Sequence, residues 1–535
     1  MIHSYKRMMN RLKIETTISA CLLAMMFFSC TTSDKVPSKD FVDYVNPYIG
    51  NISHLLVPTY PTVHLPNSML RVYPERGDFT SDRINGLPVV VTSHRGSSAF
   101  NLSPVQGDVS RPVVSYSYDL EKITPYSYSV YLDEDDIQVD YAPSHQAGIY
   151  HISFHTEGDN ALVINTRNGM LATEENGVSG YQIIDNTPTK IYLYLETSQS
   201  PVKKGVLTEG KVDTERQEGK TISLFYGTES KLDVRYGISF ISAEQAKKNL
   251  QRDITTYDVK AVADAGRKIW NETLGKITVE GGSEDEKEIF YTSLYRTYER
   301  MINISEDGKY YSAFDGKIHE DGGTPFYTDD WIWDTYRATH PLRILIEPQK
   351  ELEMIRSYIR MAEQSDRGWM PTFPEVTGDS HRMNGNHAVA VIWDAYCKGL
   401  GDFDLEAAYE ACKGAITEKT LLPWLRLPVT ELDKFYQEKG YFPALGVDEK
   451  ETCAAVHSFE KRPAISVMLG NCYDSWCLAQ IAKVLNKPEE YKRFMKMSYT
   501  YRNVYNAETG FFHPKNKDGQ FIEPFDYRYS GGQGA

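Results

Sequence analysis

Residues 126–132 read YSYSVYL. Tyr126, Tyr128, Val130 and Leu132 occupy alternate positions, so they fall on one face of an extended chain. A period of two residues predicts a half-buried β-strand. Tyrosine and β-branched residues suit that setting, because they pack well on a pleated surface.

The same alternation recurs further along the chain. The next alternating sets are Tyr150, Ile152 and Phe154, and Ile191, Leu193 and Leu195. Turn-forming residues separate the runs, at 133–136, 158–160 and 186–188. Many short strands at this spacing predict a β-sandwich, which we assign to residues 41–260.

The hydrophobic period changes in the second half. Apolar residues there follow helical spacing: Leu352, Ile355, Ile359 and Ala362; Ala388, Val391, Ile392 and Ala395; Leu478, Ile481, Ala482 and Leu485. Helices joined by long aromatic loops favour an α/α toroid. We therefore predict a multidomain β + α chain, with a helical linker over 261–289 and a helical domain over 290–535.

Size and charge narrow the class of protein. A chain of 535 residues, 41% of them hydrophobic, exceeds one ordinary core, which indicates two or more domains. The net charge is -15 and no basic run occurs after residue 35. A nucleic-acid partner is therefore not expected, because it needs a Lys/Arg footprint. The aromatic share of 12% fits sheet packing, and it also fits a sugar-binding protein.

The N-terminus has the pattern of a targeting segment. Basic residues precede a short apolar run at 18–28, which is too short to span a bilayer comfortably. The run ends in Phe28-Ser29-Cys30, which resembles a bacterial lipobox. We predict a signal peptide over 1–30, lipidation of Cys30, a flexible tether over 31–40 and a location in the bacterial cell envelope, held at the membrane only by the lipid. The alternative is an ordinary secretory signal with an incidental cysteine.

Three loop segments carry the chemistry, at 327–342, 368–396 and 457–485. The first two place carboxylates beside Trp, Tyr, Arg and His. Aromatic faces can cover the C–H face of a pyranose, while carboxylates and Arg bond its hydroxyls. Two carboxyl groups are also what glycoside hydrolysis requires.

Structural roles compete with this interpretation. An acidic loop residue often caps a helix. Trp333 and Tyr336 stand at helical spacing, which also suits a core. Asp334 and Arg337 are three residues apart, which suits a plain ion pair.

The segment 327–342, YTDDWIWDTYRATHPL, resembles YTDFSLWDTFRALHPL, a motif of glycoside hydrolase family 92. VDYVNPYIG at 42–50 is similar to the family's opening VDPFIGT, and FYTSLYRT at 290–297 to its FYTALYRT. Further similar segments, in the same order, extend the resemblance from about residue 41 to 532.

The resemblance implies a fold and an activity. Family members have an N-terminal β-sandwich and a C-terminal (α/α)6 barrel, with the active site between them. Known members are calcium-dependent, inverting exo-alpha-mannosidases, so a mannose-containing glycan is the expected substrate and Ca²⁺ the expected cofactor. Ca²⁺ suits the task because its loose oxygen coordination also accepts sugar hydroxyls. An inverting enzyme holds its two carboxyls roughly 6.5–9.5 Å apart to admit a water.

Family-matching loops from both domains are expected to converge on one pocket. The substrate-binding residues that we predict are His54, Asp329, Trp333, Asp334, Arg337 and His387.

The acid motif departs from the family pattern. When residues 370–385 are aligned without gaps to the family's general-acid motif, the catalytic Glu of that motif falls on Asp379. The side chain of Asp is one methylene shorter than that of Glu. Glu375 lies one residue from the family's other Glu and is the fallback acid. Gly470 replaces a further Glu of the family. The metal ligands are not identified by the sequence.

The family continues past the point where this resemblance stops, with its general-base Asp and much of its calcium site. We therefore expect a partial (α/α)6 toroid that is a poor or inactive mannosidase by itself, as a fragment or as a chain completed by another. The alternative function is a non-catalytic glycan-binding surface lipoprotein. The two differ in whether a second carboxylate faces Asp379 across a water-sized gap.

Overall fold

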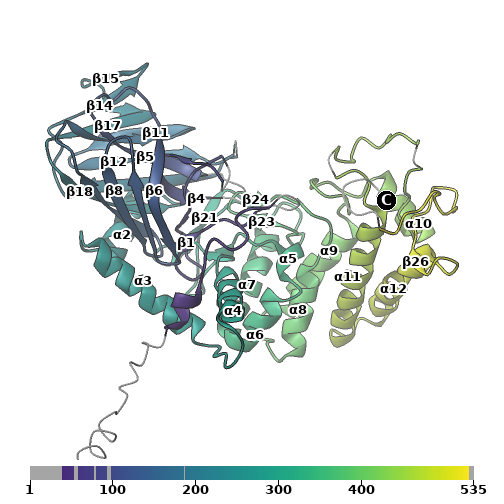
Figure 1. The fold of residues 1–535 in the computed structure, drawn as a ribbon. Coiled ribbons are helices and arrows are strands. Elements are labelled where there is room, and N and C mark those ends of the chain that lie inside the picture. The colour runs from purple at the N-terminus through teal and green to yellow at the C-terminus, as the bar shows by residue number, and fades with distance from the viewer. Residues whose placement is uncertain are drawn as a thin grey trace, which may run out of the picture.

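A β-rich domain and a row of helices lie side by side in the computed structural model (Figure 1). This confirms the predicted β-sandwich followed by a helical domain. The signal peptide predicted over 1–30, with Cys30, lies outside the described residues, as does most of the tether predicted over 31–40. The structure describes residues 39–53, 58–77, 80–92, 98–185, 187–446, 448–458 and 460–528.

Two antiparallel sheets form the sandwich within the described ranges. The ten-stranded sheet has, in spatial order, β16 (Glu218–Gly219), β11 (Gly169–Glu174), β12 (Gly177–Ile183), β13 (Lys190–Thr197), β18 (Lys231–Ser239), β9 (Ala147–Phe154), β8 (Ile137–Pro143), β7 (Ser127–Leu132), β6 (Ser115–Thr124) and β3 (Arg83–Asn85). The six-stranded sheet has β15 (Lys211–Asp213), β14 (Lys203–Thr208), β17 (Thr221–Gly227), β10 (Asn160–Asn165), β5 (Ser98–Gln106) and β4 (Leu87–Val91).

The alternation in the sequence matches the burial of the strands. On β7, Tyr128, Val130 and Leu132 are buried, while the residues between them are partly exposed. These side chains belong to the same apolar cluster as Leu162 and Ile164 of β10 in the other sheet. The core therefore lies between the two sheets, where burial removes apolar surface from water.

Two helices lie against the outside of the sandwich. Helix α2 (Ala243–Asp253) begins at Ser242, whose hydroxyl accepts from the Gln245 N–H at 3.1 Å, and it contacts β18 and β13. Helix α3 (Val259–Leu274) begins at Asp258 and contacts β8 and the short helix η1 (Phe41–Tyr44). Side-chain caps of this kind satisfy the first free N–H groups of a helix.

The remaining long helices form a row that leads away from the sandwich (Figure 1). They are α4 (Glu284–Arg296), α6 (Thr339–Ile346), α7 (Pro348–Gln364), α8 (Ala388–Cys397), α9 (Leu405–Thr417), α10 (Glu431–Lys439), α11 (Ala464–Val484) and α12 (Pro488–Ser498), with η2 (Thr500–Val504). Helix α8 contacts both α6 and α11, and α7 and α9 lie beside them. Every apolar position named from the sequence in α7 and α8 is buried, as helical spacing predicts.

Short elements lie outside the two large sheets and the long helices. They are the pairs β1 (Val63–His64) with β2 (Arg71–Val72), β19 (Ile302–Asn303) with β22 (Tyr327–Thr328), β20 (Lys309–Ser312) with β21 (Lys317–Glu320), β23 (Pro374–Glu375) with β24 (Gly378–Asp379), and β25 (Tyr505–Asn506) with β26 (Phe511–Phe512), and helix α5 (Ile332–Thr335). Of the helices that the structure describes, none has the length and apolar character needed to cross a membrane.

Candidate active site

Glu375 lies on a short hairpin between α7 and α8. Strand β23 pairs with β24, so that Glu375 stands opposite Gly378. Gly378 has a φ of +108°, which L side chains rarely adopt, so the hairpin favours glycine there. The hydroxyl of Thr328 donates to the carbonyl of Glu375 at 3.2 Å. The hairpin is thereby held to the end of β22.

The surroundings of Glu375 keep its carboxyl protonated at higher pH than usual. The side chain is buried, and burial raises its pKa to about 7. Arg382, whose Nε lies 3.0 Å from Oε1, lowers this pKa, while the negative charge of Asp329 raises it and Arg300 lowers it. A carboxyl with a pKa near neutrality can hold a proton and release it, as a general acid must.

Asp379, at the other end of the hairpin, has the opposite surroundings. Its carboxylate accepts from the backbone N–H groups of Thr372 and Phe373, both at 2.8 Å, and of His381 at 3.2 Å. Burial by itself raises the pKa of Asp379, but His381, Lys419 and these hydrogen bonds bring it below its usual value. Asp379 is thus a hydrogen-bonded anion that closes the loop, and its pKa is shifted in the opposite direction to that of Glu375.

Asp329 joins the two domains. It follows β22 with a φ of +63°, and its carboxylate accepts from Arg71 of β2 and from Arg300, whose Nη1 lies 2.6 Å away. Asp329 has no exposed surface. The guanidinium of Arg300 also lies 3.8 Å from the ring centroid of Trp331. These contacts make Asp329 a buried ionic anchor rather than an exposed sugar contact.

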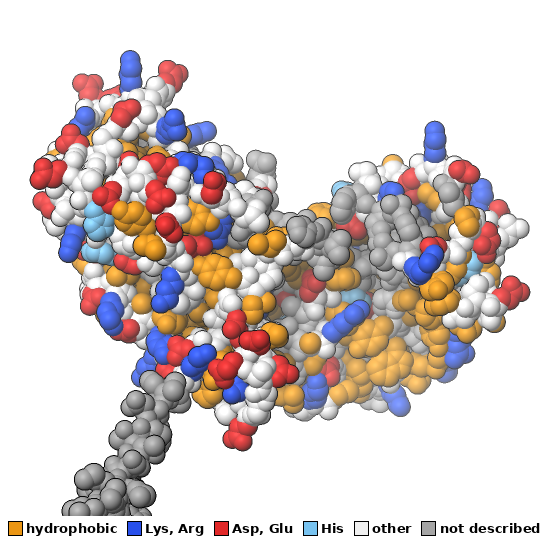
Figure 2. All heavy atoms as spheres, in the orientation of Figure 1, with side chains coloured by type: hydrophobic (Ala, Val, Ile, Leu, Met, Phe, Trp, Pro, Cys, Tyr) orange, Lys and Arg blue, Asp and Glu red, His pale blue; other side chains and the backbone are white. Residues whose placement is uncertain are grey.

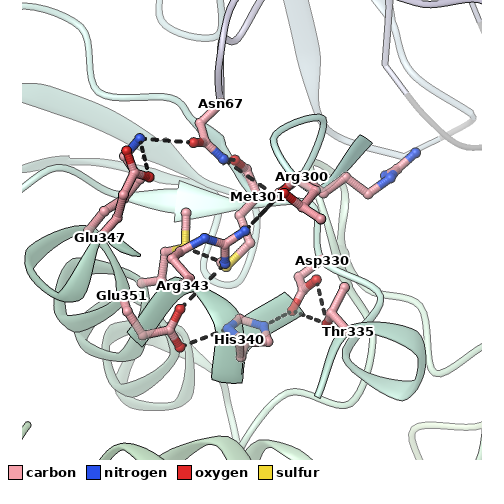
Figure 3. A network of polar contacts seen from close by, with 12 residues as sticks. Asn67, Arg300, Met301, Asp330, Thr335, His340, Arg343, Glu347 and Glu351 are labelled. Atoms are coloured by element: carbon pink, nitrogen blue, oxygen red, sulfur yellow. Dashed lines mark hydrogen bonds and ion pairs between the residues drawn. The ribbon is translucent and has the colours of Figure 1, made fainter. Parts of the chain in front are cut away.

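A second buried network, centred on His340, supports the loop that carries Asp329 and Asp330. His340 lies between two carboxylates, with Nδ1 2.8 Å from Glu351 and Nε2 2.9 Å from Asp330 (Figure 3). Burial lowers the pKa of His340, but Glu351 and Asp330 outweigh it and raise this pKa to about 9. The imidazole is therefore charged at neutral pH. Arg343 also reaches Glu351 and donates to the carbonyl of Arg300 at 3.1 Å.

Helix α5 presents the exposed part of the 327–342 segment. Trp333 is 37% exposed and Asp334 is exposed beside it. Partial burial and the nearby charge of Asp330 raise the pKa of Asp334. Arg337 donates from Nε to the hydroxyl of Tyr336 at 2.9 Å, so its hydrogen bond goes to an aromatic neighbour instead of Asp334.

His387 packs against this helix end. Its ring stacks on that of Tyr336 with 4.1 Å between centroids, and its Nδ1 lies 2.7 Å from Asp474 of α11. Asp474 also accepts from the Asn386 N–H at 2.7 Å, which fixes the orientation of the imidazole. A Cβ on Gly470 would lie 3.4 Å from His387 Cε1, so a larger residue there would crowd the ring.

These elements face the hollow between the sandwich and the far end of the helical row, which Figure 2 shows from one side. Calcium needs six to eight oxygen ligands. In the described ranges, no three His, Cys, Asp or Glu side chains gather closely enough to hold a metal ion. Asp329 and Glu375 instead have arginines as partners. The described carboxylates of this site therefore do not by themselves form a calcium site.

Comparison with protein families decides the assignment. The model of the glycosyl hydrolase family 92 catalytic domain matches residues 245–535, and that of the family 92 N-terminal domain matches residues 44–239. The chain belongs to glycosyl hydrolase family 92. The site described above, with Arg71 from the sandwich and the remainder from the helices, thus draws on both of the family's domains.

Known structures support the family 92 fold. A family 92 inverting mannosidase from Bacteroides thetaiotaomicron is 27% identical, with a TM-score of 0.81, covering 92% of this chain and 69% of its own. A family 92 alpha-mannosidase from the same organism, in complex with mannoimidazole, is 22% identical with a TM-score of 0.79, covering 91% of this chain and 67% of its own. An uncharacterized secreted glycosidase of Arthroderma benhamiae is 24% identical over 319 residues, which are 57% of this chain but only 34% of that relative.

Within this family 92 chain, the predicted site residues separate into three groups. Arg337 and His387 contact Tyr336 at the end of α5, and Trp333 and Asp334 lie on that same short helix. Glu375 and Asp329 interact electrostatically and lie deeper, with Asp379 closing the loop beside them. His54 lies outside the described residues.

Sequence reasoning missed the basic partners of the carboxylates. Arg71, Arg300 and Arg382 surround Asp329 and Glu375, and Lys419 is buried near Asp379. Arg71 and Arg300 lie in segments that resemble the family, but nothing local separates them from surface arginines. Their burial is the distinguishing signal, and it exists only in the folded chain.

Proposed function

We propose that this chain hydrolyses terminal alpha-linked mannose from a glycan, with Glu375 as the proton donor. The observation that carries the proposal is the buried carboxyl of Glu375, whose pKa is raised to about 7 on a hairpin held to β22. In glycoside hydrolysis such a carboxyl protonates the leaving oxygen. The substrate and the inverting outcome are supported by the structural likeness to the family 92 inverting mannosidase, which is 27% identical.

The exposed residues of α5 suit the sugar itself. The Trp333 ring can cover the C–H face of a pyranose, while Asp334 and Arg337 can bond its hydroxyls. In an inverting reaction a second carboxylate activates water on the opposite face of the sugar. We assign no residue to that step. Calcium is proposed from the family resemblance alone, and no step is assigned to it.

A second function is favoured by the state of Asp329. This carboxylate, beside Glu375, is fully buried and accepts from two arginines, so it cannot activate a water molecule. A site with a proton donor and sugar contacts but no base would bind a glycan without cleaving it. The alternative is therefore a glycan-binding protein, attached to the membrane by a lipid on Cys30.

The test is mannose release from an alpha-linked mannobiose, measured with and without a chelator. We expect Glu375→Gln to lower the rate by about 10² to 10⁴. The control is Asp379→Asn, checked for folding, which should retain far more activity than Glu375→Gln. Equal turnover by wild type and Glu375→Gln would refute the role of Glu375. Mannose binding without any release would favour the glycan-binding function.

A further inference from the structure

A continuous set of contacts leads from Glu375 to a separate large cleft. Arg382 is the first member. Its Nε lies 3.0 Å from Glu375 Oε1, and its guanidinium carbon lies 5.7 Å from the ring centroid of Trp424. The arginine thereby connects the proposed proton donor to an aromatic ring on the loop between α9 and α10.

Trp424 is held in a fixed and open position. It is 37% exposed and has a φ of +67°, an unusual backbone conformation for a bulky residue. Its backbone N–H donates to the carbonyl of His381 at 2.5 Å, and its indole N–H donates to Glu460 at 3.2 Å. A large ring whose backbone and indole nitrogen are both hydrogen-bonded loses little conformational entropy on binding.

His457 continues the path into the cleft. Its ring stacks on Trp424 with 5.3 Å between centroids and 22° between planes, and it also lines a cleft of about 930 Å³. The cleft is also lined by exposed aromatic rings, among them Phe511 and Tyr527, which stack on each other with 4.7 Å between centroids.

The charges around the cleft nearly cancel. Its lining includes the acidic residues Glu449, Glu451 and Asp526 and the basic residues Lys461 and Arg462. Arg462 is already paired with Glu451, its Nε lying 2.9 Å from the carboxylate. The cleft therefore combines flat aromatic faces with hydrogen-bonding groups but little net charge, a combination that suits a neutral, hydroxyl-rich ligand more than an anion.

We propose that Trp424, His457 and this cleft bind the leaving-group side of the glycan, as a subsite for a neutral oligosaccharide. The proposal rests on the function proposed for Glu375. Pyranose C–H faces stack on Trp424 and on the aromatic wall, while the polar residues bond the hydroxyls. The volume lies at the upper end of the roughly 300–1,000 Å³ of pockets for drug-sized ligands, which leaves space for more than one sugar ring. Occupation by a second copy of the chain is the competing possibility.

The test compares ligands of increasing length by calorimetry on the full chain: mannose, alpha-linked mannobiose and alpha-linked mannotriose. We expect the wild type to bind the trisaccharide about tenfold more tightly than mannose. Trp424→Ala should remove most of that gain, about five- to tenfold, and leave the affinity for mannose unchanged. Trp424→Phe should restore part of the gain.

Two controls keep the result interpretable. Trp476→Ala removes a tryptophan that is 41% exposed on α11, about 16 Å along that helix from the cleft residue Ile465, and it should change nothing. Phe511→Ala tests the aromatic lining of the cleft independently of the strained Trp424 loop, and it should also weaken only the longer ligands.

The outcomes separate the two proposals. A wild type that binds none of the three sugars refutes the proposed function. Mannose binding that does not tighten with ligand length, or a length-dependent gain that survives in both Trp424→Ala and Phe511→Ala, overturns the subsite. Self-association that Phe511→Ala abolishes, with no length-dependent gain for sugar, assigns the cleft to a second copy and also overturns it.

Discussion

The guanidinium of Arg71 donates to the carboxylate of Asp329 across the boundary between the sandwich and the helical domain, and both side chains are buried. Removing one partner of a buried pair leaves an uncompensated charge, which is far more costly than the net value of the pair. Arg300 shares the same carboxylate, so the anchor also fixes the loop beside Glu375.

We therefore expect Asp329→Asn, which leaves Arg71 and Arg300 without their carboxylate, to lower the free energy of unfolding by about 3–5 kcal/mol, and Arg71→Met, which leaves Asp329 paired with Arg300, to lower it by a smaller amount. Denaturant unfolding followed by circular dichroism measures this. The matched control is Lys260→Ala, which breaks the exposed pair with Asp264 on α3 and should leave the midpoint unchanged. A loss no larger than the control's would contradict the role of the pair as an anchor.

The raised pKa of Glu375 predicts the pH dependence of catalysis. A proton donor must be protonated in the free enzyme, so the rate should be level below about pH 7 and fall as pH rises through the pKa of about 7. The loss should approach tenfold per pH unit above that point. Initial rates of mannose release between pH 5 and 9 measure it. In Asp379→Asn the rate of mannose release should still fall above about pH 7, whereas in Glu375→Gln this fall should disappear. The reverse pattern would assign the acid role to Asp379.

His340 predicts a pH dependence of stability. Its pKa is about 9 when folded, against an ordinary value of 6.5, because Glu351 and Asp330 outweigh burial. The stabilisation is therefore complete below about pH 6.5 and is lost as pH rises through 9. The full span is about 3 kcal/mol, as an order of magnitude.

Chemical unfolding at pH 6 and pH 10 should reveal this loss, and His340→Gln should reduce it. The control is His319→Gln, which changes the partly exposed pair with Asp315 and should keep the wild-type slope. If wild type and His340→Gln lose the same stability over this range, other groups cause the dependence.

The lipobox-like Phe28-Ser29-Cys30 predicts attachment to the membrane. Cys30→Ser should release the protein in soluble form into the periplasm or medium. Cell fractionation followed by immunoblotting measures this, with Cys453→Ser as a control that leaves the N-terminus intact. Membrane association of the Cys30→Ser protein would favour another mode of attachment.

Much of the fold could be predicted from local pattern. The alternation at Tyr128, Val130 and Leu132 matches a strand with alternating burial, and the helical spacing of Leu352, Ile355 and Ile359 matches α7. Both periods reflect which side of an element faces the core. They can be read from residues close together in the sequence, because side-chain direction depends on the local backbone. The loop with Glu375 and Asp379 can also be located from the sequence, but the family alignment puts the acid on Asp379 with Glu375 as the fallback, whereas the surroundings of the two carboxyls in the fold favour Glu375.

The sequence by itself determined the two kinds of domain, their order, the family resemblance and the loops that carry the chemistry. Only the tertiary structure decided what each charged residue does there. Arg71 and Asp329 are 258 positions apart, and Glu375 and Asp379 are four apart, yet the distant pair is joined and the near pair has opposite surroundings. The reason is physical: a pKa and an ion pair depend on burial and on neighbours in space, and these exist only once the chain has folded.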